Sequence, residues 1–149
     1  MKIAFASDHA GFELKEYIKG IIENAGYSFV DFGTYTEDPV DYSDFGFKAA
    51  EFVSTGEADK GILICGTGMG MNIVANKVKG IRASLIQDLY TAIQSRKHLD
   101  ANVLVLGARV IGKGMAEEIV RVWLGTSFEG GRHERRVEKI KKWEEKHLS

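Results

Sequence analysis

The chain has 149 residues, 44% hydrophobic and 28% charged, which is typical of one domain with its own core. Because 20 Lys and Arg face 21 Asp and Glu, the net charge of −1 argues against bulk binding to nucleic acid or an anionic membrane. A lone cysteine excludes an internal disulfide, and no apolar run is long enough for a transmembrane helix. We expect one domain over residues 1–149 and, since the N-terminus turns polar at Ser7, a cytoplasmic protein without a signal peptide.

Short apolar runs alternate with longer stretches of helical spacing. Strands are predicted at residues 2–7, 27–32, 60–65, 81–86 and 102–107. Helices are predicted at residues 12–24, 44–53, 69–78, 89–97 and 113–123, with a last helix ending near residue 146. Strands that are apolar throughout are typical of parallel sheets covered on both faces. The alternation therefore predicts an α/β fold, a three-layer Rossmann-like sandwich with right-handed crossovers.

The last segment, Arg132–Ser149, differs from the other helices because no strand follows it. Its apolar residues form a narrow stripe on a charged helix: Val137, Ile140, Trp143 and Leu148. Such a helix needs a partner surface, which is either its own domain or another subunit.

In open α/β sheets, ligands bind beyond the carboxyl ends of the strands. The sharpest feature there is the glycine-rich segment Cys65–Gly70, which follows the third strand and opens a helix. Backbone N–H groups of such a loop bind anions, although a glycine turn needed for helix–sheet packing explains the same pattern. The segment lacks the Lys-Ser/Thr of a Walker loop, and its position and spacing do not suit a dinucleotide fingerprint.

Cys65 ends an apolar strand, where a cysteine is often only a small buried hydrophobe. At the start of a helix, however, positive potential favours the thiolate, which beside anion-binding amides is a plausible general base. Asp8 and His9 follow the first strand, and Asp8 is also a suitable cap for the helix that starts near Gly11. His98 precedes the fifth strand, which places it away from the carboxyl edge unless the preceding helix ends over that edge.

Arg132 and Arg136 are four residues apart, so on a helix they share one face. Next to His133 they resemble a phosphate clamp, although a solvated basic face explains them equally well. No pair of histidines or cysteines has the spacing of a metal site, and we predict no metal.

These motifs together resemble the type B ribose-5-phosphate isomerase family, which includes the galactose-6-phosphate isomerase subunits. The matching stretches are Ser7–Gly11, Val40–Tyr42, Gly61–Gly70, Ala75–Lys77, Gly80–Ala83, Asn102–Leu104 and Gly130–Arg136. They follow the family's order over nearly the whole chain. The resemblance implies a five-stranded parallel sheet and a homodimer, or a tetramer made of two such dimers, whose active site is shared between subunits. It also implies interconversion of an aldose phosphate and its ketose without a metal or organic cofactor.

By this resemblance, Cys65 is the base that moves a proton between C1 and C2. The loop residues Gly66, Thr67, Gly68, Met69 and Gly70 hold the enediolate oxygens. His98 helps to open the furanose ring, with Asp8 and Thr67 nearby. The phosphate is held by His9, Arg132 and Arg136, with Arg109 near the ligand and Tyr42 beside the sugar.

Leu99 departs from the family pattern, because members that act on ribose 5-phosphate usually carry a sugar-binding Asn at this place. Leucine cannot hydrogen-bond a sugar oxygen, so a hexose phosphate such as allose or galactose 6-phosphate stays an alternative substrate. A non-catalytic sugar-phosphate-binding module is a second alternative, since the glycine loop and the arginine pair alone suffice for binding. Acidic residues dilute the basic charge of the last helix, so neither nucleic acid nor a membrane is an expected partner.

Overall fold

The computed structural model describes residues 1–148. Five strands alternate with helices along the chain: β1 Lys2–Ser7, β2 Ser28–Asp31, β3 Lys60–Cys65, β4 Ala83–Leu85 and β5 Val103–Gly107. The helices are α1 Phe12–Asn24, α2 Tyr42–Ser54, α3 Met69–Asn76, α4 Leu89–Leu99, α5 Lys113–Leu124 and α6 Arg132–His147. The strands form one parallel sheet in the order β2-β1-β3-β5-β4. The predicted α/β fold with a five-stranded parallel sheet is therefore confirmed.

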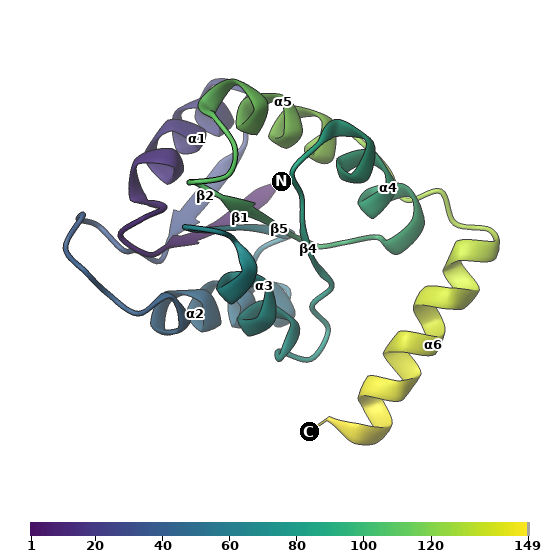
Figure 1. The fold of residues 1–149 in the computed structure, drawn as a ribbon. Coiled ribbons are helices and arrows are strands. Elements are labelled where there is room, and N and C mark those ends of the chain that lie inside the picture. The colour runs from purple at the N-terminus through teal and green to yellow at the C-terminus, as the bar shows by residue number, and fades with distance from the viewer. Residues whose placement is uncertain (149) are drawn as a thin grey trace.

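Helices cover both faces of the sheet (Figure 1). On one face, α1, α4 and α5 pack on an apolar cluster that includes Phe5, Ile18 and Trp123. On the other face, α2 and α3 pack on a second cluster that includes Ala49, Leu63 and Met71. Burial of each apolar helix stripe on a strand face is the main source of stability in such layers. Among residues 1–148, no helix is both long and apolar enough to cross a membrane.

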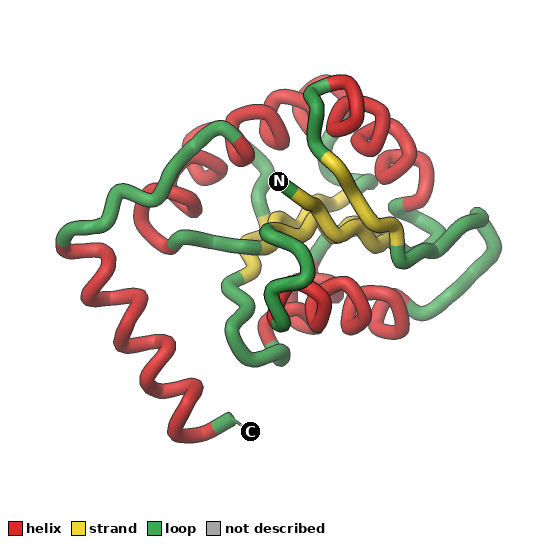
Figure 2. The backbone as a smooth tube through the Cα atoms, turned by 180° about the vertical axis from the view of Figure 1, so that it is seen from behind, coloured by secondary structure: helices red, strands yellow, loops and turns green. Residues whose placement is uncertain are grey.

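The last helix, α6, lies outside both layers and extends away from the sheet (Figures 1 and 2). It is attached near both ends to its own chain. At its start, the ring of His133 stacks on the ring of His98 in α4, with centroids 4.0 Å apart. Near its end, Glu144 Oε2 accepts a hydrogen bond of 3.0 Å from the Gly80 N–H. The expectation that this helix packs on a partner subunit stays a prediction.

Several element boundaries differ from the sequence expectation. The fourth strand is limited to Ala83–Leu85 because the N–H groups just before it bond elsewhere. The Ile81 N–H donates to Val78 O, and the Arg82 N–H donates to Asn102 Oδ1. The second helix begins at Tyr42 rather than residue 44, and the fourth continues to Leu99 rather than ending at residue 97. The last change places His98 inside a helix.

Candidate active site at the carboxyl edge of the sheet

The central strands end side by side, which brings their following loops together. Ser7 of β1 lies opposite Ile64 of β3, and Cys65 lies opposite Gly107 of β5. The loops continue this pairing, since the Asp8 N–H donates to Ile64 O and the Ala108 N–H donates to Cys65 O. Asp8, Cys65 and the segment after Gly107 therefore converge at one edge, as the sequence predicted for a parallel sheet.

The glycine loop forms the start of α3 without a side-chain cap. Gly68 is the N-cap residue and has φ of 83°, a left-handed conformation that glycine adopts without strain. Because the N-cap residue Gly68 has no side chain, first-turn N–H groups other than that of Met69 are available to an anion, and the helix dipole favours negative charge there. Thr67 Oγ1 accepts a weak bond of 3.3 Å from the Met69 N–H. Thr67 and Met69 are exposed, so the loop faces solvent on one side.

Tyr42 and Arg109 lie against this loop. A Cβ atom built on Gly70 would be 2.7 Å from the Tyr42 ring, so only glycine allows the ring to lie there. A Cβ atom on Gly66 would be 3.3 Å from Nη1 of Arg109. The Arg109 side chain is exposed while its backbone N–H is bonded to Gly66 O at 2.9 Å. A guanidinium and a phenol thus border the backbone amides at which an oxyanion would bind.

Cys65 itself is 4% exposed and belongs to the apolar cluster under α2 and α3. Its burial agrees with both interpretations of this residue, the small core side chain and the base at the edge of a cleft. Asp8 is also buried, and its Oδ1 accepts a hydrogen bond of 3.0 Å from the Gly11 N–H. Gly11, not Asp8, is the N-cap of α1, so Asp8 supports the helix start through its carboxylate rather than as the cap residue.

His9 is half-buried, and its Nδ1 accepts a hydrogen bond of 3.1 Å from the Val40 N–H. This bond ties the end of β1 to the long loop that joins β2 to α2 (Figure 1). The same loop leads into Tyr42 at the start of α2. His9 and Tyr42 are thereby positioned by one segment of chain.

The second group of predicted residues, namely His98, Leu99, Arg132 and Arg136, lies elsewhere in the subunit. Helix α4 starts at Leu89 near the carboxyl edge and runs back, so His98 lies roughly 14 Å further along the helix axis. Leu99 is at the amino edge, where its carbonyl accepts a bond of 2.9 Å from Arg82 Nε. Arg132 and Arg136 are exposed on α6. One subunit therefore does not bring these residues to Cys65.

Around His98 the structure shows contacts that the sequence did not predict. The rings of His98 and His133 are stacked at an interplanar angle of 12°. His133 is buried, and its Nε2 has no hydrogen-bond partner among residues 1–148. Glu129 lies near, with its carboxylate 3.8 Å from that nitrogen. Burial, then the adjacent His98, then Arg132 lower the pKa of His133 below its usual value.

Ligand atoms of His98, Glu129 and His133 lie within 4.8 Å of one another, so this cluster is the candidate for a metal ion in the described chain. The surrounding charge does not favour a cation. Arg132 and Arg136 flank the cluster, and the positive end of the α6 dipole points to it. Electrostatics therefore favours an anion at this position, and the absence of a metal site stays a prediction.

A cavity of about 510 Å³ follows the outer side of β4, between α3 and α4. His98 and Leu99 line one part of it. Two of its lining residues, Asn72 and Gln94, carry buried side-chain oxygens without a donor among residues 1–148. The sequence carried no signal for these two residues, since single polar residues on helices are usually solvent-exposed. Buried acceptors usually have a donor in folded proteins, so these two oxygens call for one from water, a ligand or another chain.

The whole chain resembles known proteins closely. The model of the ribose/galactose isomerase family matches residues 3–140. The chain belongs to this family. It is 50% identical to a putative sugar phosphate isomerase of Bacillus subtilis, covering 99% of this chain and all of that protein. It is 48% identical to ribose-5-phosphate isomerase B of Escherichia coli over 93% of each chain. A galactose-6-phosphate isomerase subunit of Clostridium acetobutylicum is 41% identical over 86% of this chain and 74% of that one.

Solved structures agree with the sequence comparison. Ribose-5-phosphate isomerase B of Clostridium thermocellum has 52% identity and a TM-score of 0.96 over 99% of both chains. The Mycoplasma genitalium enzyme, solved with bound ribulose 5-phosphate, has 42% identity and a TM-score of 0.93 over 97% of this chain and 96% of that one. The predicted family and the enzyme class, a sugar-phosphate isomerase, are thereby confirmed.

Proposed function

We propose that this protein interconverts ribose 5-phosphate and ribulose 5-phosphate through a cis-enediolate. The observation that carries the proposal is the arrangement at the carboxyl edge: a thiol at the end of β3, next to the uncapped start of α3. Similarity to a structure holding ribulose 5-phosphate supports the choice of sugar. No metal or cofactor is needed for this chemistry.

In the proposed reaction, the Cys65 thiolate takes the proton from C2 of the open-chain aldose. The electron pair of the broken C–H bond forms the C1–C2 double bond, and negative charge moves to O1. Backbone N–H groups of Gly66–Gly70 stabilise this charge, an effect for which loss of one donor typically costs about 2.7–4 kcal/mol. The Cys65 thiol, whose proton exchanges with solvent, then protonates C1, and movement of the O2 hydroxyl proton to O1 gives the ketose. Thr67 and Asp8 assist the ring-opening step by hydrogen bonding.

We further propose that the site is shared between two copies of the chain. His98, Leu99, Arg132 and Arg136 lie away from Cys65 within one subunit, so a second copy has to supply them. There His98 would protonate the ring oxygen, while His9, Arg109 and the two α6 arginines would bind the phosphate. The donor-free oxygens of Asn72 and Gln94 support an interface along β4.

A hexose 6-phosphate is the second candidate substrate, and Leu99 is the observation that favours it. Leu99 is 45% exposed and lines the cavity that also contains His98, so an apolar side chain stands where a sugar-binding Asn is usual. The similarity to a galactose-6-phosphate isomerase subunit also supports this alternative. The additional carbon of a hexose would lie near Leu99, where an apolar contact needs no hydrogen bond.

A panel of phosphorylated aldoses with the purified protein distinguishes the two substrates. We expect kcat/KM to be highest for ribose 5-phosphate. A preference for allose or galactose 6-phosphate would contradict the pentose assignment. A variant, Leu99→Asn, should raise kcat/KM for the pentose relative to the hexoses, and Leu99→Met is its apolar control. Binding of all sugars without turnover would instead support the non-catalytic module.

A further inference from the structure

Lys15 is a buried charge that the proposed reaction does not use. It lies in α1 with a fully buried side chain. Its Nζ donates to Asp31 Oδ1 at 2.7 Å, to Asp31 Oδ2 at 2.8 Å and to Thr34 O at 2.6 Å. An ammonium group has three N–H donors, so this set of partners satisfies it. Replacing a buried ion pair by well-packed apolar side chains often leaves a protein equally stable or more stable. The Lys15–Asp31 pair therefore suggests a role beyond stability.

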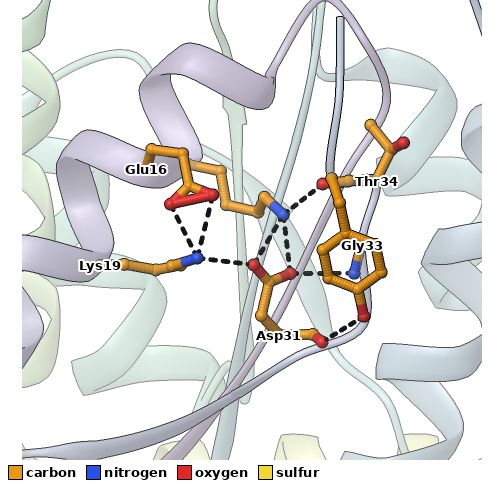
Figure 3. A network of polar contacts seen from close by, with 7 residues as sticks. Glu16, Lys19, Asp31, Gly33 and Thr34 are labelled. Atoms are coloured by element: carbon orange, nitrogen blue, oxygen red, sulfur yellow. Dashed lines mark hydrogen bonds and ion pairs between the residues drawn. The ribbon is translucent and has the colours of Figure 1, made fainter. Parts of the chain in front are cut away.

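Asp31 is the centre of this network (Figure 3). Besides Lys15 it binds Lys19 Nζ at 2.7 Å and accepts the Gly33 N–H at 2.9 Å. Burial alone would raise the pKa of Asp31, but the hydrogen bonds from Lys15, Lys19 and Gly33 lower it. Burial lowers the pKa of Lys15, and the hydrogen bond and charge of Asp31 oppose that change. The carboxylate form of Asp31 thus holds both lysines.

The network fixes the start of the loop that joins β2 to α2. Residues 33 and 34, which bond Asp31 and Lys15, are also hydrogen-bonded to the end of β1. The Ser7 N–H donates to Gly33 O, and the Thr34 N–H donates to Ser7 O, both at 2.7 Å. Thr34 is therefore held from two sides, by Lys15 through its carbonyl and by Ser7 through its N–H.

The far end of the same loop contacts His9. The Val40 N–H donates to His9 Nδ1 at 3.1 Å. A backbone N–H can only donate, so Nδ1 carries no proton in this arrangement, and the neutral ring has its proton on Nε2. This tautomer leaves one donor, Nε2–H, for a ligand oxygen.

We propose that Lys15 is a positioning residue that acts through the loop of residues 33–41. By holding Thr34, it places the Val40 N–H on Nδ1 of His9 and so presents Nε2–H to the substrate phosphate. The phosphate part of this inference rests on the proposed function. The tautomer of His9 is a property of the free protein and does not depend on it.

The test compares Lys15→Met with Lys19→Met. Both variants remove a cation from Asp31, but only Lys15 also bonds the carbonyl of Thr34. Nitrogen-15 NMR of the ring nitrogens of His9, in the protein without ligand, reports the tautomer. We expect the Nε2–H form in the wild type and in Lys19→Met, and a mixture of tautomers in Lys15→Met.

Kinetics with ribose 5-phosphate supplies the second readout. We expect KM to rise about tenfold in Lys15→Met, the factor for one lost hydrogen bond to a charged group, with kcat nearly unchanged. Lys19→Met should keep the wild-type KM. A variant Lys15→Met that melts at a lower temperature yet keeps the wild-type tautomer and KM would overturn the proposal, because the residue would then be purely structural.

Val40→Pro keeps the proposal testable if Lys15→Met does not fold. It removes the N–H that bonds His9, and Val40→Ala is its control because alanine keeps that N–H. We expect mixed tautomers and a raised KM only in the proline variant; an unchanged tautomer contradicts the proposal. If the tautomer depends on Lys15 but no sugar phosphate is turned over, the positioning inference holds and the proposed function fails.

Discussion

Cys65 occupies a position at which two roles are compatible with the same structure. As a core residue it would contribute only packing, and Cys65→Ala would lower the melting temperature while activity is retained. As the base, it is indispensable to proton transfer. We expect Cys65→Ala to lower kcat by about 10²–10⁴-fold, the usual range for a positioned acid or base. Steady-state kinetics together with thermal unfolding separates the two, with Cys65→Ser as a control of similar size. Near wild-type turnover in both variants would exclude Cys65 as base.

His133 predicts a pH dependence of stability. Its pKa is lowered by burial, then by His98 and then by Arg132, whereas the unfolded ring titrates near 6.5. Between the folded and the unfolded pKa, the unfolded state binds more protons, so the free energy of unfolding falls with falling pH. The contribution is complete above about pH 6.5 and is lost as the pH falls through the folded pKa. Urea unfolding measures the free energy of unfolding at each pH. Between pH 7.5 and pH 5, this free energy should fall less in His133→Asn than in the wild type. Equal losses would show that this ring does not titrate differently on folding.

Among single residues, those that follow parallel strands were the most predictable. Asp8 directly follows β1, Cys65 ends β3 and Arg109 comes two residues after β5. The parallel sheet brings those strand ends together. The stack of His98 on His133 was not predictable, because it depends on where α6 returns to the domain after a loop without regular structure.

At the scale of elements, α6 shows how a charged helix is attached to a domain. Glu144 is 8% exposed, and its carboxylate accepts the Gly80 N–H. We expect Glu144→Ala to cost about 1.5–3 kcal/mol, the range for a hydrogen bond to a charged group. Hydrogen exchange should quicken at Gly80 and in the second half of α6. Glu145→Ala, at the exposed neighbouring position, is the matched control. The same exchange in both variants would show that the bond does not hold the helix.

The edge strand β4 shows why element boundaries were less predictable than element types. The apolar residues Ile81, Ala83, Leu85 and Ile86 suggested a strand over residues 81–86, yet side chains replace backbone partners on the outer side. Asn76 Oδ1 accepts the Ala83 N–H at 2.9 Å, and Asn76 Nδ2 donates to Ala83 O at 3.0 Å. A side-chain amide thus takes the place of a neighbouring strand and protects an edge that would otherwise pair with other chains. The contact between Asn76 and Ala83 spans seven residues and depends on the turn after α3, which the sequence pattern does not specify.

At the scale of the whole molecule, the two groups of predicted residues lie apart within one subunit. If the active site is shared, one defective copy can complement another. Cys65→Ala and His98→Asn should each have little activity alone. Unfolding and refolding them together should restore activity, up to about one quarter of the wild-type value for random pairing into dimers with one intact site each. Activity of the mixture after gel filtration is the measurement, and a mixture of two different Cys65 variants is the control. No recovery would contradict a site built from two copies.

The central claim is that Cys65 moves a carbon-bound proton of the sugar phosphate, and deuterium tests it most directly. Ribose 5-phosphate is incubated with the protein in deuterium oxide, and carbon-bound deuterium in the sugar is followed by NMR and mass spectrometry. We predict deuterium at C2 of the aldose and at C1 of the ketose with the wild type, and incorporation slower by at least about 10²-fold with Cys65→Ala. Isomerisation without any carbon-bound deuterium, or equal incorporation by Cys65→Ala, would contradict the account.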